Sequence, residues 1–159
     1  MFRIGHGYDV HRISIEEKPL MLGGIEVNAP FSLQAHSDGD VILHAITDAL
    51  LGAGALGDIG QHFPDTHLKH KSQASSDFLV YSQQGIHELD YKISNIDVTV
   101  IAQAPKLAPY VIEMRQSIAT LLQLKINQVN IKATTTEKLG FTGRKEGIAC
   151  HAVTIIYNL

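Results

Sequence analysis

Residues 7–11 read GYDVH and lie inside an apolar run, residues 2–13, whose pattern predicts a β-strand. Side chains two positions apart point to the same face of a strand, so Asp9 and His11 are expected to converge on one spot. His6 has the opposite parity and is expected to face away. An apolar strand is expected to fill a core, yet this one carries a carboxylate and an imidazole on one face. The question is what that face binds.

A helix is predicted from about Gly39 to Gly52 or Gly54, within the stretch HSDGDVILHAITDALLGAGALGD. Ser37 followed by Asp40 resembles a capping box ahead of the apolar run. The two glycines near its end are typical of a helix terminus.

This helix carries Asp40, His44 and Asp48 at a spacing of four, which predicts one polar stripe on an otherwise apolar helix. If the strand meets that stripe, His44 joins Asp9 and His11 to give two imidazoles and one carboxylate. Such a set suits a tetrahedral divalent metal with one open position, and zinc is the best match. The alternative is a hydrogen-bonded Asp–His pair beside a core histidine.

The rest of the chain alternates strand and helix patterns, and the order predicts one α+β domain over residues 1–159. We expect a mixed sheet with helices on one face, whose other face another subunit could cover. The remaining elements are a strand or hairpin arm at 19–27, a helix at 75–89, a strand at 91–104, a helix from Ala108 or Pro109 to Leu122, a strand from Val129 that runs into a polar loop, and a last strand at 147–157.

Composition narrows the class of protein. The net charge is −3 without long charged runs, which argues against nucleic-acid binding. The single Cys150 permits no internal disulfide, suits a reducing compartment and is predicted to be a small core residue. No run approaches the roughly 20 apolar residues of a membrane span, and the apolar pattern begins at Phe2, so we expect a cytoplasmic protein. Charged residues make up only 18%, which favours an oligomer that hides part of its surface.

Two stretches are candidates for phosphate binding. KATTTEKLGFTGRKEG, residues 132–147, offers Thr hydroxyls, backbone N–H groups, glycines and cationic side chains, and Glu137 could hold Mg²⁺. His36 and Ser37 lie at a helix N-terminus, which favours anions. The alternatives are a Thr-rich strand end with turn glycines and a serine that only caps.

A rival group of imidazoles occurs in HFPDTHLKHK, which contains His62, His67 and His70. Pro and Lys in this stretch predict a loop. We therefore expect these three histidines to be solvated loop residues.

Taken together, GHGYDVH, the helix stretch, FPDT, IAQAPKLAP and ATTTEKLGFTGRKEGIAC occur in one order over essentially the whole chain. The sequence closely resembles the 2-C-methyl-D-erythritol 2,4-cyclodiphosphate synthase family of the non-mevalonate isoprenoid pathway. The resemblance implies a homotrimer of ferredoxin-like α/β sandwich subunits with active sites between neighbours. It also implies a phosphorus–oxygen lyase that cyclises 4-diphosphocytidyl-2-C-methyl-D-erythritol 2-phosphate and releases CMP. An axial cavity in such trimers can take isoprenoid diphosphates.

The resemblance also implies roles for particular residues. Zinc is placed on Asp9, His11 and His44, and Mg²⁺ or Mn²⁺ on Glu137. His36 and Thr135 match the transition-state stabilisers. The implied substrate contacts are Asp9, His11, His36, Ser37, Asp58, Ile59, Gly60, Phe63, Pro64, Asp65, Thr66, His67, Ala102, Gln103, Ala104, Pro105, Lys106, Leu107, Ala108, Thr134, Thr135, Thr136, Glu137, Phe141 and Arg144.

One departure is His67, where the family often has an acid. Two other functions stay open. A trimeric binding protein could keep the metal and cavity without turnover, and a zinc-dependent phosphohydrolase could use Asp40 or Asp48 as a base.

Overall fold

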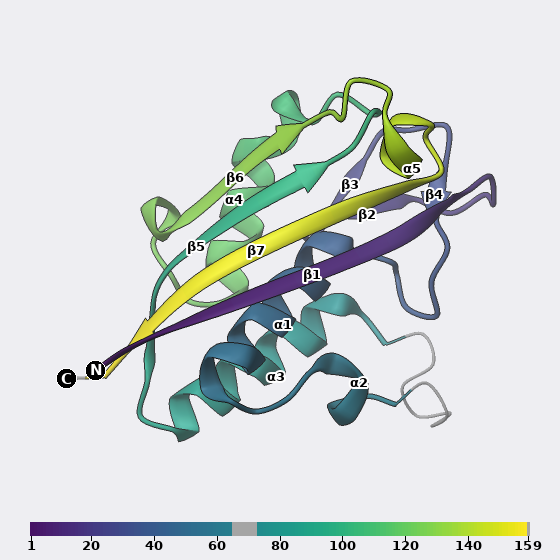
Figure 1. Cartoon of the computed structure of the whole chain (residues 1–159). Helices are drawn as coiled ribbons and strands as arrows, with labels where there is room; N and C mark the ends of the chain where they lie inside the picture. The colour runs from purple at the N-terminus through teal and green to yellow at the C-terminus, as the bar shows by residue number, and fades with distance from the viewer. Residues whose placement is uncertain (65–72, 159) are drawn as a thin grey trace.

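A five-stranded mixed sheet organises the chain, in a computed structural model that describes residues 1–64 and 73–158 (Figure 1). The strand order is β4-β1-β7-β5-β6, and only the β5–β6 pair is parallel. These strands are β1 (Phe2–Ser14), β4 (Ser32–Leu33), β5 (Lys92–Ile101), β6 (Val129–Thr134) and β7 (Gly147–Tyr157). A separate hairpin contains β2 (Leu20–Leu22) and β3 (Ile25–Val27).

The three long helices all lie behind the sheet in Figure 1. They are α1 (Val41–Gly54), α3 (Ser75–Glu88) and α4 (Val111–Leu121). Short helical turns complete the chain at α2 (Ile59–His62), η2 (Ala108–Tyr110), η3 (Ile126–Gln128) and α5 (Gly140–Gly143). The predicted α+β class, the mixed sheet and the placement of the helices are confirmed.

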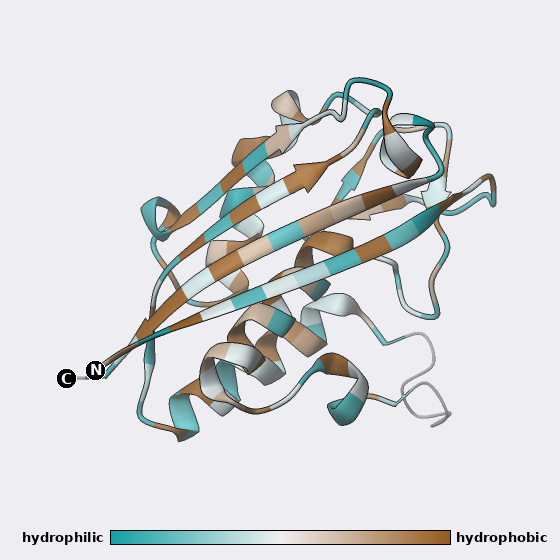
Figure 2. Cartoon of the chain, in the orientation of Figure 1, coloured by the Kyte–Doolittle hydropathy of each residue, from teal (hydrophilic) through white to brown (hydrophobic). Residues whose placement is uncertain are grey.

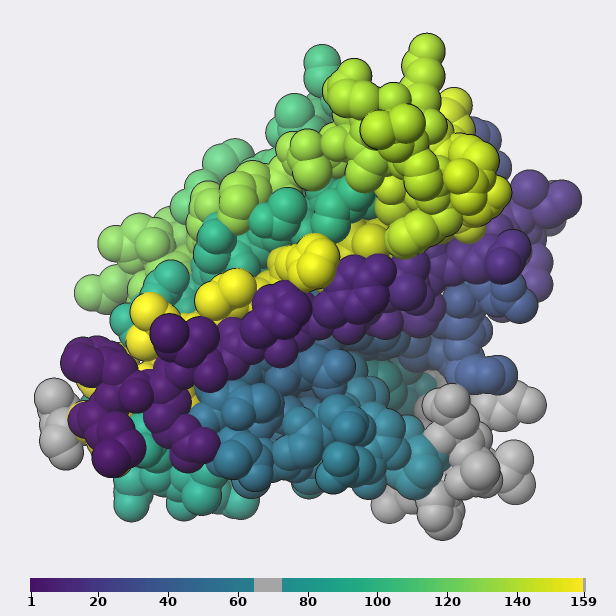
Figure 3. Space-filling view, in the orientation of Figure 1, coloured from purple at the N-terminus to yellow at the C-terminus, as the bar shows by residue number. Residues whose placement is uncertain are grey.

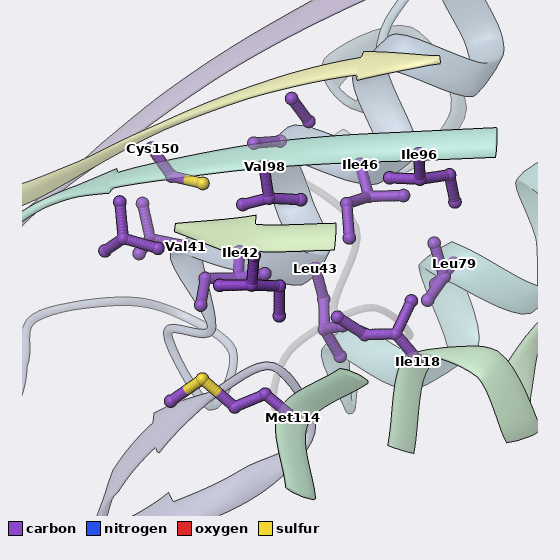
Figure 4. Packing of buried hydrophobic residues seen from close by; sticks show 14 of the residues in the cluster. Val41, Ile42, Leu43, Ile46, Leu79, Ile96, Val98, Met114, Ile118 and Cys150 are labelled. Carbon is purple, nitrogen blue, oxygen red and sulfur yellow. The ribbon is translucent and has the colours of Figure 1, made fainter. Parts of the chain in front are cut away.

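The core fills the space between the sheet and the helices (Figure 4). From the sheet, Val98 and Cys150 point into it, and from α1 Ile42 and Ile46 do, all without exposed surface. The prediction that Cys150 is a small core residue is confirmed, and burial raises the pKa of its thiol. Among the described residues, no helix is long and apolar enough to cross a membrane.

Helix α1 packs directly on the backbone of β1, because two glycines face it. A Cβ added to Gly5 would lie 1.8 Å from the carbonyl oxygen of Ala49, and one added to Gly7 would lie 1.9 Å from that of Ala45. No side chain fits at either position. This close approach places His44, the neighbour of Ala45, against the next helix-facing positions of β1.

The other face of the sheet is open in the single chain. Figures 2 and 3 look onto this face, where β1 and β7 run side by side. Many of its β1 and β7 positions carry apolar side chains, and the exposed ones are Phe2, Ile4, Tyr8, Val10 and Val153. Apolar surface of this kind is typical of a face that another protein surface covers.

The predicted start of α1 needs correction. Asp40, not Ser37, is its N-cap residue, and the Asp40 carboxylate accepts hydrogen bonds from the backbone N–H groups of Ile42 and Leu43. The same carboxylate accepts from Gly23 at 2.9 Å and Gly24 at 2.6 Å, in the β2–β3 turn. A capping box therefore does not form at the predicted pair, because the acid itself is the cap.

Candidate metal centre

Three side chains from β1 and α1 converge on one point. Asp9 Oδ2 lies 3.1 Å from His11 Nε2 and 3.0 Å from His44 Nδ1, and the two ring nitrogens are 3.1 Å apart. The alternation of β1 brings Asp9 and His11 to the helix-facing side, as the sequence predicts. The close packing of α1 brings His44 to the same point.

This triangle fits a divalent cation. Metal–nitrogen and metal–oxygen bonds of about 2.0–2.2 Å would let one ion touch all three atoms from one side, with a fourth position left open. Two imidazoles and one carboxylate form a donor set that suits zinc among other transition metals. Among the described residues, this is the group of His, Cys, Asp and Glu side chains whose geometry could hold a metal ion.

Electrostatics at the triangle favour positive charge. Burial alone would raise the pKa of Asp9, but hydrogen bonds and attraction from His11 and His44 outweigh it and hold that pKa well below the usual range. Burial alone would lower the pKa of His44, but the hydrogen bond and charge of Asp9 raise it overall. The carboxylate thus stays ionised beside two imidazoles, as a cation site requires.

The predicted polar stripe on α1 does not form as a unit. Asp40 is committed to the backbone N–H groups of the cap and the hairpin turn, and burial raises its pKa. Asp48 accepts from the backbone N–H of Ile59 at 2.9 Å. Only His44 of the three reaches the metal centre, because the other two meet backbone donors that the sequence pattern does not reveal.

The residues at 58–64 form a wall beside the centre. Asp58 caps α2 by accepting from the backbone N–H of Gln61 at 2.9 Å, which holds Ile59 and Gly60 in the first turn. The Phe63 ring, next to Pro64, packs against Phe78 with ring centroids 4.5 Å apart.

Phe78 links that wall to the metal centre, because its ring centroid lies 5.8 Å from that of His44. The expectation that His62 is a solvated loop residue is wrong. It lies in α2, where Nε2 is 2.7 Å from the carbonyl oxygen of Leu56 and Nδ1 is 3.0 Å from the Tyr81 hydroxyl. The predicted positions Asp65, Thr66, His67 and His70 lie outside the described residues.

Beside the centre, the loop between β4 and α1 carries His36 and Ser37. The Ser37 hydroxyl is 3.4 Å from His44 Nε2 and accepts from the backbone N–H of Gly39 at 3.2 Å. His36 is exposed. Ser37 therefore lies beside the metal ligand His44, and His36 precedes it in the chain.

A second group of predicted residues gathers where β5 and β6 end. Ala102 N–H donates to the Thr134 carbonyl at 3.0 Å, and Lys138 N–H donates to Gln103 Oε1 at 3.3 Å, which joins the two loops. Thr135 Oγ1 donates to Glu137 Oε1 at 3.0 Å. The other predicted residues in these loops are Ala104, Pro105, Lys106, Leu107, Ala108 and Thr136.

Phe141 and Arg144 lie just beyond this group. Phe141 belongs to α5 and is partly exposed. Arg144 donates through Nε and Nη2 to the two carboxylate oxygens of Glu146, at 2.9 and 3.1 Å. The guanidinium therefore already holds one carboxylate in a two-point contact.

The two groups lie at the same end of the sheet but on different strands. Asp9 pairs with Cys150, Cys150 with Val100, and Val100 with Ala133, so these four residues form one row across the sheet. Three strand spacings of about 4.8 Å separate β1 from β6 by roughly 14 Å. Within one chain, the metal centre and the Thr135–Glu137 loop are therefore not brought together.

Fold and site together define an α+β protein with a candidate metal centre between its first strand and its first long helix. A family model described as the YgbB family matches residues 2–157, and the chain belongs to that family. A curated relative from Idiomarina loihiensis, named 2-C-methyl-D-erythritol 2,4-cyclodiphosphate synthase, is 58% identical over 97% of this chain and 96% of its own length. The predicted family is thus confirmed.

Solved structures agree with this assignment. IspF from Plasmodium falciparum, solved as a CDP complex, is 40% identical with a TM-score of 0.87, over 99% of this chain and 96% of that one. The bifunctional IspDF from Campylobacter jejuni matches with a TM-score of 0.96 and 43% identity over 100% of this chain. This chain spans 43% of that bifunctional protein.

Proposed function

We propose that this protein is a metal-dependent 2-C-methyl-D-erythritol 2,4-cyclodiphosphate synthase of isoprenoid precursor biosynthesis. The observation that carries the proposal is the triangle of Asp9, His11 and His44 in a member of the YgbB family. The substrate would be 4-diphosphocytidyl-2-C-methyl-D-erythritol 2-phosphate. The products would be the cyclic diphosphate and CMP, which makes the enzyme a phosphorus–oxygen lyase.

The reaction is an intramolecular phosphoryl transfer. An oxygen of the 2-phosphate forms a bond to the β-phosphorus, the bond from that phosphorus to the bridging oxygen breaks, and CMP leaves with the bridging oxygen. Both reacting groups are anionic, so catalysis consists chiefly of alignment and charge neutralisation. A divalent ion on the triangle would supply a Lewis acid and a template for phosphate oxygens.

The side chains near the triangle fit this role. His36 and Ser37 lie beside it and can donate hydrogen bonds to phosphate oxygens. The second group offers the Lys106 ammonium, the Thr135 hydroxyl and the Glu137 carboxylate, all exposed. We infer that Glu137 holds Mg²⁺ or Mn²⁺ against the diphosphate, since hard cations prefer carboxylate and phosphate oxygens.

The separation of the two groups supports a site shared between copies of the chain. About 14 Å of sheet lies between them, so one chain cannot close both groups around one small reacting centre. We infer that the metal centre of one copy faces the Thr135–Glu137 loop of a neighbour in a homotrimer. The apolar open face of β1 and β7 supports such an assembly. The loops at Ala102–Ala108 and Thr134–Glu137 would hold the cytidine diphosphate end, in keeping with the CDP complex of the Plasmodium relative.

One assay tests the proposal. The purified protein is given the cytidine diphosphate substrate with Zn²⁺ and Mg²⁺, and phosphorus NMR follows the products. We expect CMP and a cyclic diphosphate in equal amounts. Release of inorganic phosphate would identify a phosphohydrolase instead, and unchanged substrate would identify a binding protein.

A matched pair of variants tests the second cation site. Glu137→Gln should lower the Mg²⁺-dependent rate by about 100-fold, because the amide cannot neutralise the ion. Glu113→Gln, which changes an exposed glutamate on α4, should leave the rate unchanged. Equal rates for both variants would remove Glu137 from the proposal.

A further inference from the structure

His44 has two ring nitrogens, and the metal centre uses only one of them. Nδ1 faces Asp9 and His11, at 3.0 and 3.1 Å. Nε2 points the other way and lies 2.8 Å from the hydroxyl of Ser75. Ser75 is fully buried and is the first residue of α3. Ser75 lies 31 residues from His44 in the sequence and contacts the ring nitrogen of His44 that faces away from the metal centre.

Ser75 is in turn held by Asp38. The backbone N–H of Ser75 donates to Asp38 Oδ2 at 3.1 Å, and the Ser75 hydroxyl donates to Asp38 Oδ1. The N-cap residue of α3, Ala74, has no side chain that can cap, so Asp38 performs that task from outside the helix. Asp38 Oδ1 also accepts from the backbone N–H of Asp40, at the start of α1.

The direction of these hydrogen bonds follows from the number of protons available. An ionised carboxylate only accepts, so the single hydroxyl proton of Ser75 must point to Asp38. The Ser75 oxygen then has only lone pairs to offer His44, which means that Nε2 of His44 carries a proton. When the ring is neutral and Nε2 carries its proton, the lone pair lies on Nδ1, where a cation facing Asp9 and His11 can take the place of the proton shared with Asp9.

Ser37 does not provide the same control. Its hydroxyl is 3.4 Å from His44 Nε2, against 2.8 Å for Ser75, and it already accepts from the backbone N–H of Gly39. The short, buried contact is the one to Ser75. A buried hydrogen bond whose two partners are both fixed holds a ring more firmly than a long, half-exposed one.

We propose that Ser75 and Asp38 are positioning residues for the metal centre, which hold the proton of His44 on Nε2 and present Nδ1 to the ion. Hydrogen-bond partners behind a ligating histidine fix its tautomer and orientation, and their loss typically weakens metal binding 10–100-fold. The proposal rests on the metal site of the proposed function and adds residues outside its ligand set. It also couples the start of α3 to metal occupancy.

Zinc affinity tests the proposal with a matched pair of variants. Ser75→Ala removes the hydroxyl, and Ser82→Ala removes a hydroxyl from an equally buried serine seven residues later on α3, where it donates to the Leu79 carbonyl at 2.8 Å. Competition between the full-length protein and a fluorescent chelator for Zn²⁺ measures the dissociation constant. Ser75→Ala should bind about 10–100-fold more weakly, and Ser82→Ala should stay within about threefold of the unchanged protein. Equal weakening in both variants, or none in Ser75→Ala, would overturn the proposal.

A second variant and a spectroscopic readout cover the case in which Ser75→Ala perturbs the helix. Asp38→Asn keeps the shape of the side chain, but an amide cannot accept at both oxygen positions, so it should weaken zinc binding in the same direction. Nitrogen-15 NMR of labelled histidine, with His44 assigned by its loss in His44→Gln, reports which ring nitrogen of His44 carries the proton in the zinc-loaded protein. We expect the proton on Nε2, and a proton on Nδ1 would refute the positioning role.

The outcomes separate this proposal from the proposed function. If the unchanged protein turns over the substrate and binds zinc, but Ser75→Ala binds it equally well, only the positioning role fails. If the unchanged protein binds no stoichiometric zinc, the metal centre itself is wrong and the positioning role falls with it.

Discussion

The two faces of β1 each carry a histidine contact, and the two contacts differ in kind. On the helix-facing side, His11 meets His44 and a carboxylate, and all three side chains are at least half-buried between β1 and α1. On the open side, His6 Nε2 lies 3.0 Å from His151 Nδ1, and the Tyr8 ring is tilted against His151 with ring centroids 4.8 Å apart. Within residues 1–64 and 73–158, no third metal-ligating side chain joins that second pair.

The difference shows what turns a pair of imidazoles into a candidate metal centre. A carboxylate adds the negative charge that offsets a divalent ion, and the packed helix holds the ligands in place. The open pair lacks both features, although His6 lies on the same strand as His11, five residues before it. The alternation of side chains along β1 decides on which face of the sheet a residue lies. The packing of α1 against one of those faces decides whether the side chains there can hold a metal ion.

The largest expected effect comes from a substitution that separates α1 from β1, because their close packing distinguishes the helix-facing side from the open side. Gly7→Ala should destabilise the protein by about 5 kcal/mol, because the new Cβ would lie 1.9 Å from the Ala45 carbonyl oxygen. Urea unfolding followed by circular dichroism measures the change. Gly52→Ala is the control, since this exposed helical glycine has only a carbonyl oxygen at 4.0 Å, and it should stabilise α1 by about 0.5–1 kcal/mol. A Gly7→Ala protein within 1 kcal/mol of the unchanged one would contradict the close approach.

The next largest effect separates the two histidine contacts by metal binding. His44→Ala leaves two ligands, so zinc affinity should fall about a thousandfold, or about 4 kcal/mol. His151→Ala removes a histidine from the open pair and should leave one tight zinc ion per chain. Dialysis followed by metal analysis decides between them, and stoichiometric zinc in His44→Ala would show that the helix-facing triangle is not the site.

A third test asks whether the open face is covered by other copies. Ile4→Asp puts a charge on a side chain that is 71% exposed on that face, and Ile112→Asp does the same at a 62% exposed position on α4. A carboxylate buried in an interface costs about 3 kcal/mol, so only Ile4→Asp should reduce the number of associated copies. Light scattering on the eluting protein measures the mass. A full-mass assembly of Ile4→Asp would place the interface elsewhere.

The smallest effect concerns the polar side of the open face. Burial opposes ionisation of Asp97, but hydrogen bonds from Lys132 and Asn130, together with the charge of Lys132, outweigh burial and lower its pKa. A lowered carboxyl pKa stabilises the fold above the unfolded value of about 3.9, and this contribution is lost as the pH falls through the folded value. Because the pair is exposed, Asp97→Asn should cost less than about 1 kcal/mol at pH 7. The difference from the unchanged protein in urea unfolding should shrink as the pH falls below about 3.9, and a larger loss at low pH would reverse the assigned sign.

Most of the fold was predictable because local patterns determine it. The strands around Asp9 and Cys150 alternate clearly, and their bounds agree with the prediction within a residue. The metal triangle also followed from local rules, since parity joins Asp9 to His11 and only one imidazole lies on the predicted stripe of α1.

Two of the errors and omissions involve contacts between distant segments. Asp40 was assigned to a stripe because its partners Gly23 and Gly24 lie 17 and 16 residues upstream. Ser75 was missed because it meets Asp38 across 37 residues of chain. A spacing pattern carries no signal for such pairs, whereas a serine at the start of a predicted helix could have been flagged as needing an acceptor.

The row of paired residues from Asp9 to Ala133 makes the sheet a fixed spacer between the metal centre and the Thr135–Glu137 loop. If neighbouring copies join their halves, a chain disabled at His44 and a chain disabled at Thr135 should complement each other after mixing. With random exchange in a cyclic assembly, about a quarter of the junctions regain two intact halves, although neither parent is active. Activity would then depend on the association of neighbouring chains and would decrease on dilution.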